Sequence, residues 1–272
     1  YTFDNRDTPS YDKQSPDEQA SMAGLRYQYA EKSNVYVNAQ QTFRFLATDE
    51  FYDIFSGLNT ALRPQKGWQY EAGVKHSVND TLVLHVTPYY ITNKDEIFFE
   101  PLINFGFGSN SNYDRTRRMG IELGQELDLL KLADISGFDQ MEFFTNYTFQ
   151  KPQFEKGAFK DNDIPMAPRH MASAGLKTAF LKNIHLSLSG NYVGPSFAIN
   201  DTRNALPKVK PYFIADTRLS YDRQNWELFF GVNNLFDKKY FNYVIAQANG
   251  GTNSDYYPAP ERNYNVGMNL KF

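Results

Sequence analysis

Apolar and polar residues alternate with a period of two along many segments of this chain. The clearest segment is the last one, where residues 264, 266, 268, 270 and 272 are apolar or aromatic and the residues between them are polar or small. The same alternation recurs in segments 23–29, 119–124, 184–192, 213–221 and 226–233. A period of two is the pattern of β-strands with one apolar and one polar face. The pattern therefore predicts an all-β protein.

The links between the predicted strands alternate between short and long. Short polar turns fall at 31–33, 78–80, 181–183 and 222–225, with a longer turn near 132–138. The long links fall at 8–19, 47–66, 96–112, 153–168, 195–210 and 241–260. Strands joined in this way place every long link at the same end of an antiparallel sheet. This arrangement is typical of outer-membrane barrels, and it predicts about 12 strands.

Aromatic content and hydropathy favour the same fold. Aromatic residues make up 16% of the chain, with 19 Tyr, 23 Phe and 2 Trp. Tyr and Trp concentrate at membrane–water interfaces, and several lie near predicted strand ends: Trp68, Tyr70, Tyr192, Tyr212, Tyr221, Trp226, Tyr240 and Tyr264. No apolar run approaches the ~18 residues of a spanning helix. A mean hydropathy of −0.58 fits a barrel, because the mean is taken over both the apolar lipid-facing and the polar lumen-facing residues of each strand.

Charge and cysteine usage exclude other classes. The 28 Lys and Arg nearly balance the 31 Asp and Glu, so no basic field indicates nucleic acid. The chain has no Cys, which excludes disulfides and thiolate metal sites. Asp161 and Asp163 match part of a calcium loop without its later Gly and Glu, so we expect a solvated loop there. Pro88 lies inside a predicted strand, where we expect a bulge or an early end to pairing.

Catalytic residues are not expected, so the chain is predicted not to be an enzyme. The four histidines, His76, His85, His170 and His185, lie singly on predicted strands. The nearest nucleophile–base candidates, His170 and Ser173, differ in parity and would face opposite sides of a sheet. Metal ligands are not expected either, because an isolated His on a wet wall has no partner ligand.

The last part of the chain carries a family resemblance. The segment GVNNLFDKKY at 231–240, followed by YPAPERNYNVG at 257–267, resembles the last two strands of TonB-dependent receptors. Glu261 stands where that family usually has Gly. Upstream, segments 43–45, 62–65, 70–75, 89–97 and 118–123 resemble further landmarks in the same order, with Gln65 in place of the usual Glu.

The resemblance implies a fold larger than this chain. Receptors of the family have a barrel of about 22 strands around an N-terminal plug, preceded by a segment that contacts TonB. Residues 1–272 are therefore expected to be the C-terminal part of a transmembrane antiparallel β-barrel, with the plug and N-terminal strands elsewhere. The alternative is a closed barrel of about 12 strands, in which residues near 1–7 would pair with the last strand.

The resemblance also implies a function, a location and partners. We expect a monomeric receptor in the bacterial outer membrane that imports a scarce nutrient with energy from the TonB–ExbB–ExbD system. Its surroundings would be outer-membrane lipid, and it would need no resident cofactor. Phe272, a terminal aromatic, is expected to be the signal for the barrel-assembly machinery. The alternative function is a passive porin or structural barrel.

Ligand contacts are expected in the long loops. Aromatic rings with nearby Arg side chains suit a planar, anionic iron chelate, which favours a ferric siderophore as the transported ligand. The candidate contacts are Phe51, Tyr52, Phe99, Phe105, Phe107, Arg115, Arg117, Tyr256 and Tyr257. The alternative is that these side chains pack on one another or form the aromatic belt. Charged residues expected on the wet inner wall are Arg26, Lys75, Glu122, Asp216, Arg218, Glu227 and Lys271.

Overall fold

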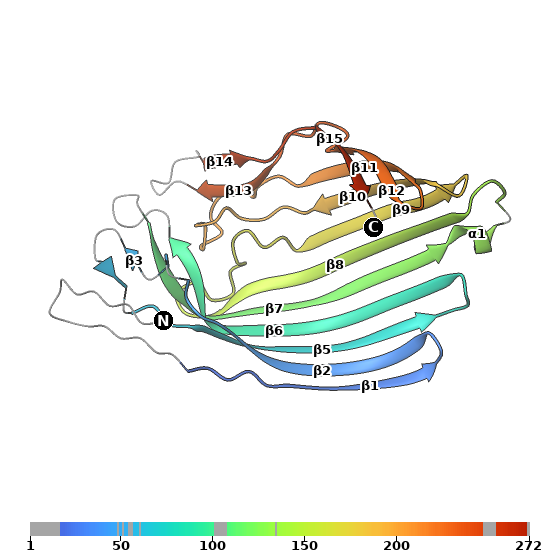
Figure 1. Cartoon of the computed structure of the whole chain (residues 1–272). Coiled ribbons are helices and arrows are strands. Elements are labelled where there is room, and N and C mark those ends of the chain that lie inside the picture. Colours follow the sequence, from blue (N-terminus) through green and yellow to red (C-terminus); the bar gives the residue numbers. More distant parts are fainter. Residues whose placement is uncertain are drawn as a thin grey trace.

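The computed structural model describes residues 17–270, apart from 48, 51, 54–56, 60, 101–107, 134 and 247–253 (Figure 1). Its main feature is an 11-stranded sheet in which each neighbouring pair is antiparallel. The strands, in sheet order, are β1 (Met22–Ala30), β2 (Ser33–Arg44), β5 (Gln65–Ser77), β6 (Leu82–Glu100), β7 (Ser109–Asp128), β8 (Gln140–Lys156), β9 (His170–Phe180), β10 (Ile184–Val193), β11 (Tyr212–Asp222), β12 (Trp226–Asn233) and β15 (Asn263–Leu270). The predicted all-β antiparallel architecture is confirmed.

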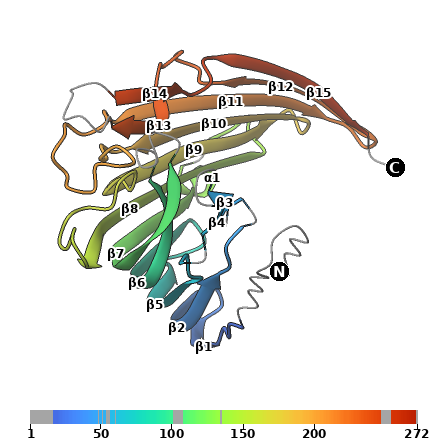
Figure 2. The same cartoon turned by 90° about the vertical axis from the view of Figure 1, so that its left-hand side faces the viewer.

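The sheet is curved and open. Figure 2 shows the strands following one another around an arc, with β1 and β15 at its two edges. Within the described residues the barrel is therefore not closed. The main sheet has 11 strands, where the sequence predicted about 12. The residues near 1–7, which the closed alternative would require, lie outside the described part of the chain.

The two ends of the sheet differ as predicted. The short turns gather at one end and the long links at the other (Figure 1). At the short-turn end, a single helical turn, α1 (Leu129–Leu132), is capped by the Asp128 carboxylate, which accepts the N–H groups of Leu130 and Lys131. β6 and β7 have 19 and 20 residues, about twice the length that a tilted strand needs to cross a bilayer. Their excess length extends the wall at the long-loop end.

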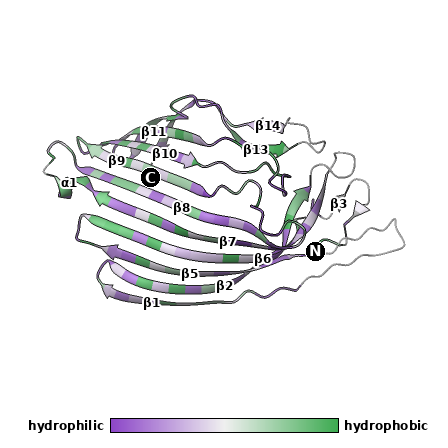
Figure 3. Cartoon of the chain, turned by 180° about the vertical axis from the view of Figure 1, so that it is seen from behind, coloured by the Kyte–Doolittle hydropathy of each residue, from purple (hydrophilic) through white to green (hydrophobic). Residues whose placement is uncertain are grey.

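Each strand has an outer and an inner face. One cross-strand row is apolar: Val35, Val74, Val86, Leu123 and Tyr147. The row one residue away is polar: Asn34, Lys75, His85, Gly124 and Asn146. The alternation appears as bands of opposite hydropathy along the strands in Figure 3. Because barrel strands point apolar residues outward and polar residues inward, we call the first face outer and the second inner.

Pro88 does not produce the expected bulge or early end of pairing. β6 continues for 12 residues beyond Pro88 to Glu100, and Pro88 stays opposite Ile121 of β7. On the other side, pairing with β5 is interrupted between Val86 and Tyr89 and resumes in the same register. The prediction was wrong because a proline removes one donor from one side of a strand only. The ladder on its other side is unaffected.

Two small hairpins stand within the long links. β3 (Tyr52–Asp53) pairs with β4 (Gly57–Leu58), and β13 (Phe241–Ala246) pairs with β14 (Ser254–Pro258). The sequence predicted these segments only as long links. In the described part of the chain, no helix is both long and apolar enough to cross a membrane.

Candidate functional site

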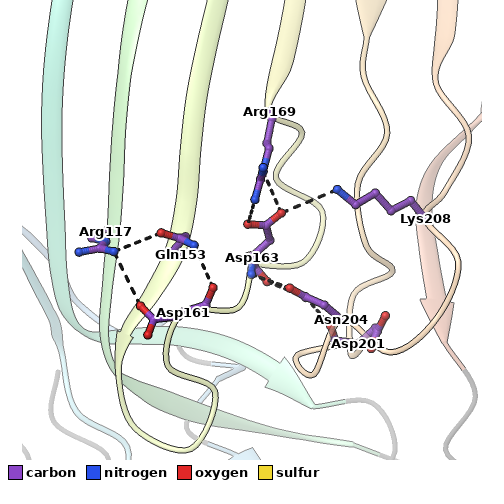
Figure 4. Close-up of polar contacts among 8 residues, drawn as sticks. All are labelled: Arg117, Gln153, Asp161, Asp163, Arg169, Asp201, Asn204 and Lys208. Atoms are coloured by element: carbon purple, nitrogen blue, oxygen red, sulfur yellow. Dashed lines mark hydrogen bonds and ion pairs between the residues drawn. The ribbon is translucent and has the colours of Figure 1, made fainter.

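The long-loop end contains a buried carboxylate that joins two loops. Asp163 lies between β8 and β9, and its side chain is only 8% exposed. Arg169 donates two hydrogen bonds to this carboxylate, from Nε (3.0 Å) and Nη2 (2.7 Å). Lys208, from the β10–β11 loop, places its ammonium 3.8 Å from the same carboxylate (Figure 4). The Asp163 hydrogen bonds raise the pKa of the Arg169 guanidinium further, so this cation is held charged.

Asn204 and Asp201 complete this junction from the β10–β11 loop. The Asn204 side chain accepts the Asp163 backbone N–H (2.6 Å) and donates to the Asp163 carbonyl (3.0 Å). The Asp201 carboxylate accepts the N–H groups of Ala205 and Leu206 at 2.9 and 3.0 Å. Asn204 has a positive φ of 54°, which asparagine tolerates well. The two loops therefore behave as one packed unit.

A small apolar cluster joins the β13–β14 hairpin to the same loops. Ala198, Val244 and Ala246 are buried together, with Phe241 packed against them. The N–H of Ile199 donates to the carbonyl of Val244 at 2.8 Å. We call residues 157–169, residues 194–211 and this hairpin the loop block. It gives the long-loop end of the sheet a fixed surface rather than three independent loops.

The NNLFD segment forms the corner that leads from β12 into the hairpin. Asn234, 2% exposed, accepts the Lys238 N–H (2.8 Å) and donates to the carbonyls of Lys238 (2.9 Å) and Pro260 (3.3 Å). Asp237 accepts the backbone N–H of Arg262 at 2.9 Å. This bond, together with the Arg262 charge, lowers the pKa of Asp237. The motif thus has a structural role, because it ties the start of β15 to the end of β12.

The predicted ligand contacts fall into three groups. Phe51, Phe105 and Phe107 lie outside the described residues, as does the side chain of Tyr52. Phe99 is 41% exposed at the tip of β6, with its ring against Gly108. Tyr256 and Tyr257, about half exposed on β14, contact the rings of Phe241 (4.8 Å) and Tyr243 (5.3 Å). The structure therefore places two of the predicted aromatic residues on the loop block, and because they are consecutive in β14 they face opposite sides of the hairpin.

The two predicted arginines lie elsewhere. Arg117 is in the cross-strand row of Trp68 and Thr92, on the outer face. Its Nη2 donates to Gln153 (3.1 Å) and lies 3.9 Å from Asp161. Arg115 is two residues further along β7 on the same face. Because both arginines belong to β7 rather than to the β13–β14 hairpin, we leave them out of the proposed ligand site.

The residues of the junction were not predicted from the sequence. Asp163 was expected in a solvated loop, but it is 6% exposed overall and bound to Arg169. Its neighbour Asp161 has the expected exposure, with 67% of its side chain accessible. The spacing of Asp163 and Arg169 along one loop was the available signal. It does not reveal Asn204, which is 41 residues away.

The inner wall carries paired charges, as expected of a wet interior. Arg118 donates to Glu96 at 2.6 Å, and Arg218 donates to Glu227 at 2.9 Å. At the short-turn end, a hollow of about 830 Å³ lies against this wall, lined by residues that include Arg26, Lys75, His85, Glu126 and Lys177. Lys271 lies outside the described residues. In the described part of the chain, no three His, Asp or Glu residues are grouped to hold a metal ion.

A curved antiparallel sheet with an apolar outer face, a polar inner face, and turns and loops at opposite ends is the wall of a membrane β-barrel. The family model described as TonB dependent receptor-like, beta-barrel matches residues 1–235. The chain therefore belongs to the TonB-dependent receptor family, and it is a protein of the bacterial outer membrane. The predicted resemblance and location are confirmed. The family and its named relatives are receptors and transporters rather than enzymes.

Individual relatives agree with the family. The chain is 28% identical over 188 residues to the ferrichrome outer membrane transporter/phage receptor of Escherichia coli K12, a match covering 65% of this chain and 23% of that protein. It resembles the ferric citrate transporter FecA with a TM-score of 0.69 and 20% identity, over 93% of this chain and 38% of that one. It resembles the copper transporter OprC with a TM-score of 0.68 and 18% identity, over 92% and 39%.

The chain spans between 23% and 39% of the length of these relatives. The structural likenesses show the shared fold. Because the long loops of outer-membrane barrels face outside, we call the long-loop end of the sheet the external end.

Proposed function

We propose that this chain is the C-terminal part of a receptor of about 22 strands that imports a scarce nutrient with energy from TonB. The open sheet of 11 strands supplies half of such a barrel and leaves both edges free to continue. Contact with the TonB–ExbB–ExbD system would come from a segment elsewhere in the longer protein. Phe272 remains the proposed signal for the barrel-assembly machinery, and a monomer is the proposed state.

The transported ligand that we propose is a ferric siderophore. The observation that carries this choice is that two half-exposed rings, Tyr256 and Tyr257, lie one on each face of the β13–β14 hairpin of the loop block at the external end. Exposed aromatic rings on a rigid support suit a flat, conjugated chelate. Two relatives are named as transporters of iron chelates, ferrichrome and ferric citrate. A third is named as a copper transporter, so another metal complex is the second candidate.

Uptake of radiolabelled iron tests the transport proposal. Cells that produce the full-length receptor would be given ferric siderophores labelled with radioactive iron, in strains with and without TonB. We expect saturable uptake that needs TonB, while binding at the cell surface persists without it. Uptake that does not need TonB and does not saturate would instead support the passive porin.

The ligand site is tested by removing the two rings. In the full-length receptor, Tyr256→Ala with Tyr257→Ala should weaken siderophore binding by roughly tenfold, because each aromatic contact contributes about 0.5–1.5 kcal/mol. The matched control is Tyr192→Ala, an exposed tyrosine of the outer face. Equal binding by the double variant and the control would remove both tyrosines from the proposed site. Siderophore binding would be measured by equilibrium titration of the purified receptor.

A further inference from the structure

Four cations lie side by side on the outer face, one on each of β5, β6, β7 and β8. Lys66 is opposite Lys94, Lys94 is opposite Arg115, and Arg115 is opposite Lys156. We call these four residues the cation row. Opposed residues on antiparallel neighbours share a face, with Cβ atoms about 5 Å apart, and like charges in such positions repel. The fold alone therefore gives no reason to place four cations in one row.

Ion pairs within the protein neutralise only part of this row. Lys66 lies 2.8 Å from the Glu18 carboxylate. Lys94 lies 4.0 Å from Asp95, but that carboxylate already binds Arg63 at 2.7 Å. In the part of the chain that the structure describes, neither Arg115 nor Lys156 has an ion-pair partner. The row is left with an excess of positive charge.

One carboxylate stands next to the row without pairing to it. Glu155 is the extra residue where the register of β7 and β8 shifts, between the partners of Arg115 and Thr116. Its carboxylate accepts a hydrogen bond from the Thr92 hydroxyl at 3.3 Å. Arg117, one row closer to the apolar band, lies 3.9 Å from the Asp161 carboxylate, so that pair adds little net charge to this face.

Asp114, next to Arg115 in sequence, also places its carboxylate beside Gly157, the residue after Lys156. Glu18, Glu155 and Asp114 together offset three of the four cations and Asp95 is shared with Arg63, so the row keeps a small positive excess.

The row lies directly beyond the aromatic edge of the apolar band. Trp68 and Tyr70, two and four residues from Lys66 on β5, are exposed, and their rings are stacked at 5.9 Å. Two residues of a strand span about 7 Å. Exposed Trp and Tyr mark the level where hydrocarbon meets headgroups. The cation row therefore stands about 7 Å beyond Trp68, at the level of the lipid headgroups on the external side.

We propose that the cation row binds the phosphate groups of an anionic lipid in the outer leaflet. Lysine and arginine form short, charge-assisted hydrogen bonds with phosphate, and Arg115 can present two N–H groups at once. The rings of Trp68 and Tyr70 would contact the apolar part of the same molecule. A bound phosphate would also remove the repulsion between the opposed cations.

A lipid suits this site better than a soluble anion does. The row continues the outer face of the wall, so any occupant borders hydrocarbon on one side and water on the other. A lipid headgroup has that position already, and its acyl chains would lie along the exposed side chains of Tyr70 and Met119. The cation row is on the outer face only, so lipid binding there is independent of the ligand imported through the lumen.

The test uses the full-length receptor, purified in mild detergent. Lipid A carrying its two phosphates, and the same lipid after enzymatic dephosphorylation, would be titrated against it by native mass spectrometry. The test variant combines Lys94→Gln, Arg115→Gln and Lys156→Gln. The matched control combines Lys160→Gln, Lys210→Gln and Lys239→Gln, three exposed lysines of the external end outside the row. Heat-modifiable migration on gels would confirm that both variants are folded.

We expect phosphorylated lipid A to bind wild type and control equally, and the test variant on the order of 100-fold more weakly, since each basic residue near an anionic lipid contributes several-fold. Dephosphorylated lipid should bind all three proteins weakly. Equal binding of phosphorylated lipid by test variant and wild type would overturn the proposal. Displacement of the lipid by millimolar inorganic phosphate would overturn the choice of a lipid as occupant.

Discussion

The loop block and the cation row lie at the same end of the barrel wall, but charges of opposite sign are neighbours in the block and charges of like sign are neighbours in the row. In the loop block, the buried Asp163 carboxylate is surrounded by Arg169 and Lys208 within 4 Å. In the cation row, the nearest cross-strand neighbours of Arg115 are two lysines. The difference indicates that the block is stabilised by its own contacts, whereas the row needs a partner from outside the protein.

The largest expected effect comes from removing the carboxylate at the centre of the loop block. Asp163→Ala leaves Arg169 and Lys208 without their shared partner, and we expect a loss of roughly 2–3 kcal/mol of local stability. Hydrogen exchange of the full-length receptor should then quicken by more than about tenfold at the N–H groups of Asn204, Ala205 and Leu206. The matched control is Asp161→Ala on the same loop, which removes an exposed carboxylate 3.9 Å from Arg117.

That control should change exchange rates little, because exposed ion pairs contribute about 0–1 kcal/mol. If both variants exchanged at the same rate as the wild type, the two loops would not be held together through Asp163.

A smaller effect of opposite sign is expected in the cation row. Arg115→Glu places a carboxylate between Lys94 and Lys156, so repulsion becomes attraction and the barrel should gain about 0.2–1 kcal/mol of stability. The same variant should lose binding of phosphorylated lipid. Thermal unfolding of the receptor in detergent and the lipid titration would be measured together. A variant that lost both stability and lipid binding would indicate that Arg115 has an ordinary structural role.

The smallest expected effect is a pH dependence at the NNLFD corner. The Asp237 pKa is lowered, first by the Arg262 backbone N–H and then by the nearby Arg262 charge. A lowered pKa in the folded state gives a contribution that is complete above about pH 4 and is lost as the pH falls through the lowered pKa. Protection of the Arg262 N–H, measured relative to its intrinsic exchange rate, should therefore fall in acid in the wild type. In Asp237→Asn the same amide should show no such step beyond the intrinsic pH dependence of exchange.

Much of the wall could be predicted from the sequence because its physics is local. A period of two fixes which residues share a face, and turn residues fix where strands end. The alternation at residues 184–192, for example, predicts that Leu188 and Tyr192 of β10 share the outer face, as they do in the structure. The alternation of short and long links also correctly predicted that the short turns lie at one end of the sheet and the long loops at the other (Figure 1). The main sheet has 11 strands among the described residues, against about 12 predicted, and the segment near 1–7 is not among those residues.

The candidate site was less accessible to prediction because it depends on contacts between distant segments. Asp163 and Asn204 meet only after two loops fold onto each other. The β13–β14 hairpin is held by burial of Val244 against Ala198. Such packing between distant segments cannot be predicted from the local sequence pattern. Part of the cation row could be predicted from the sequence, because the short turn at 78–80 sets the register that places Lys66 opposite Lys94. The pairing of Arg115 with Lys156 also depends on the irregularity between β7 and β8, which the sequence does not reveal.

Every conclusion about the wall depends on which face of the sheet is outer and which is inner. The accessibility of individual positions to dissolved oxygen tests this assignment most directly. This chain has no Cys, and a nitroxide label would be attached in turn at positions 84, 85, 86 and 87 of a full-length receptor in a bilayer, each time on the single Cys of the protein. We predict that collision with oxygen, which concentrates in lipid, is high at Leu84 and Val86 and low at His85 and Thr87. High values at His85 and Thr87, or no alternation, would contradict the orientation of the barrel wall.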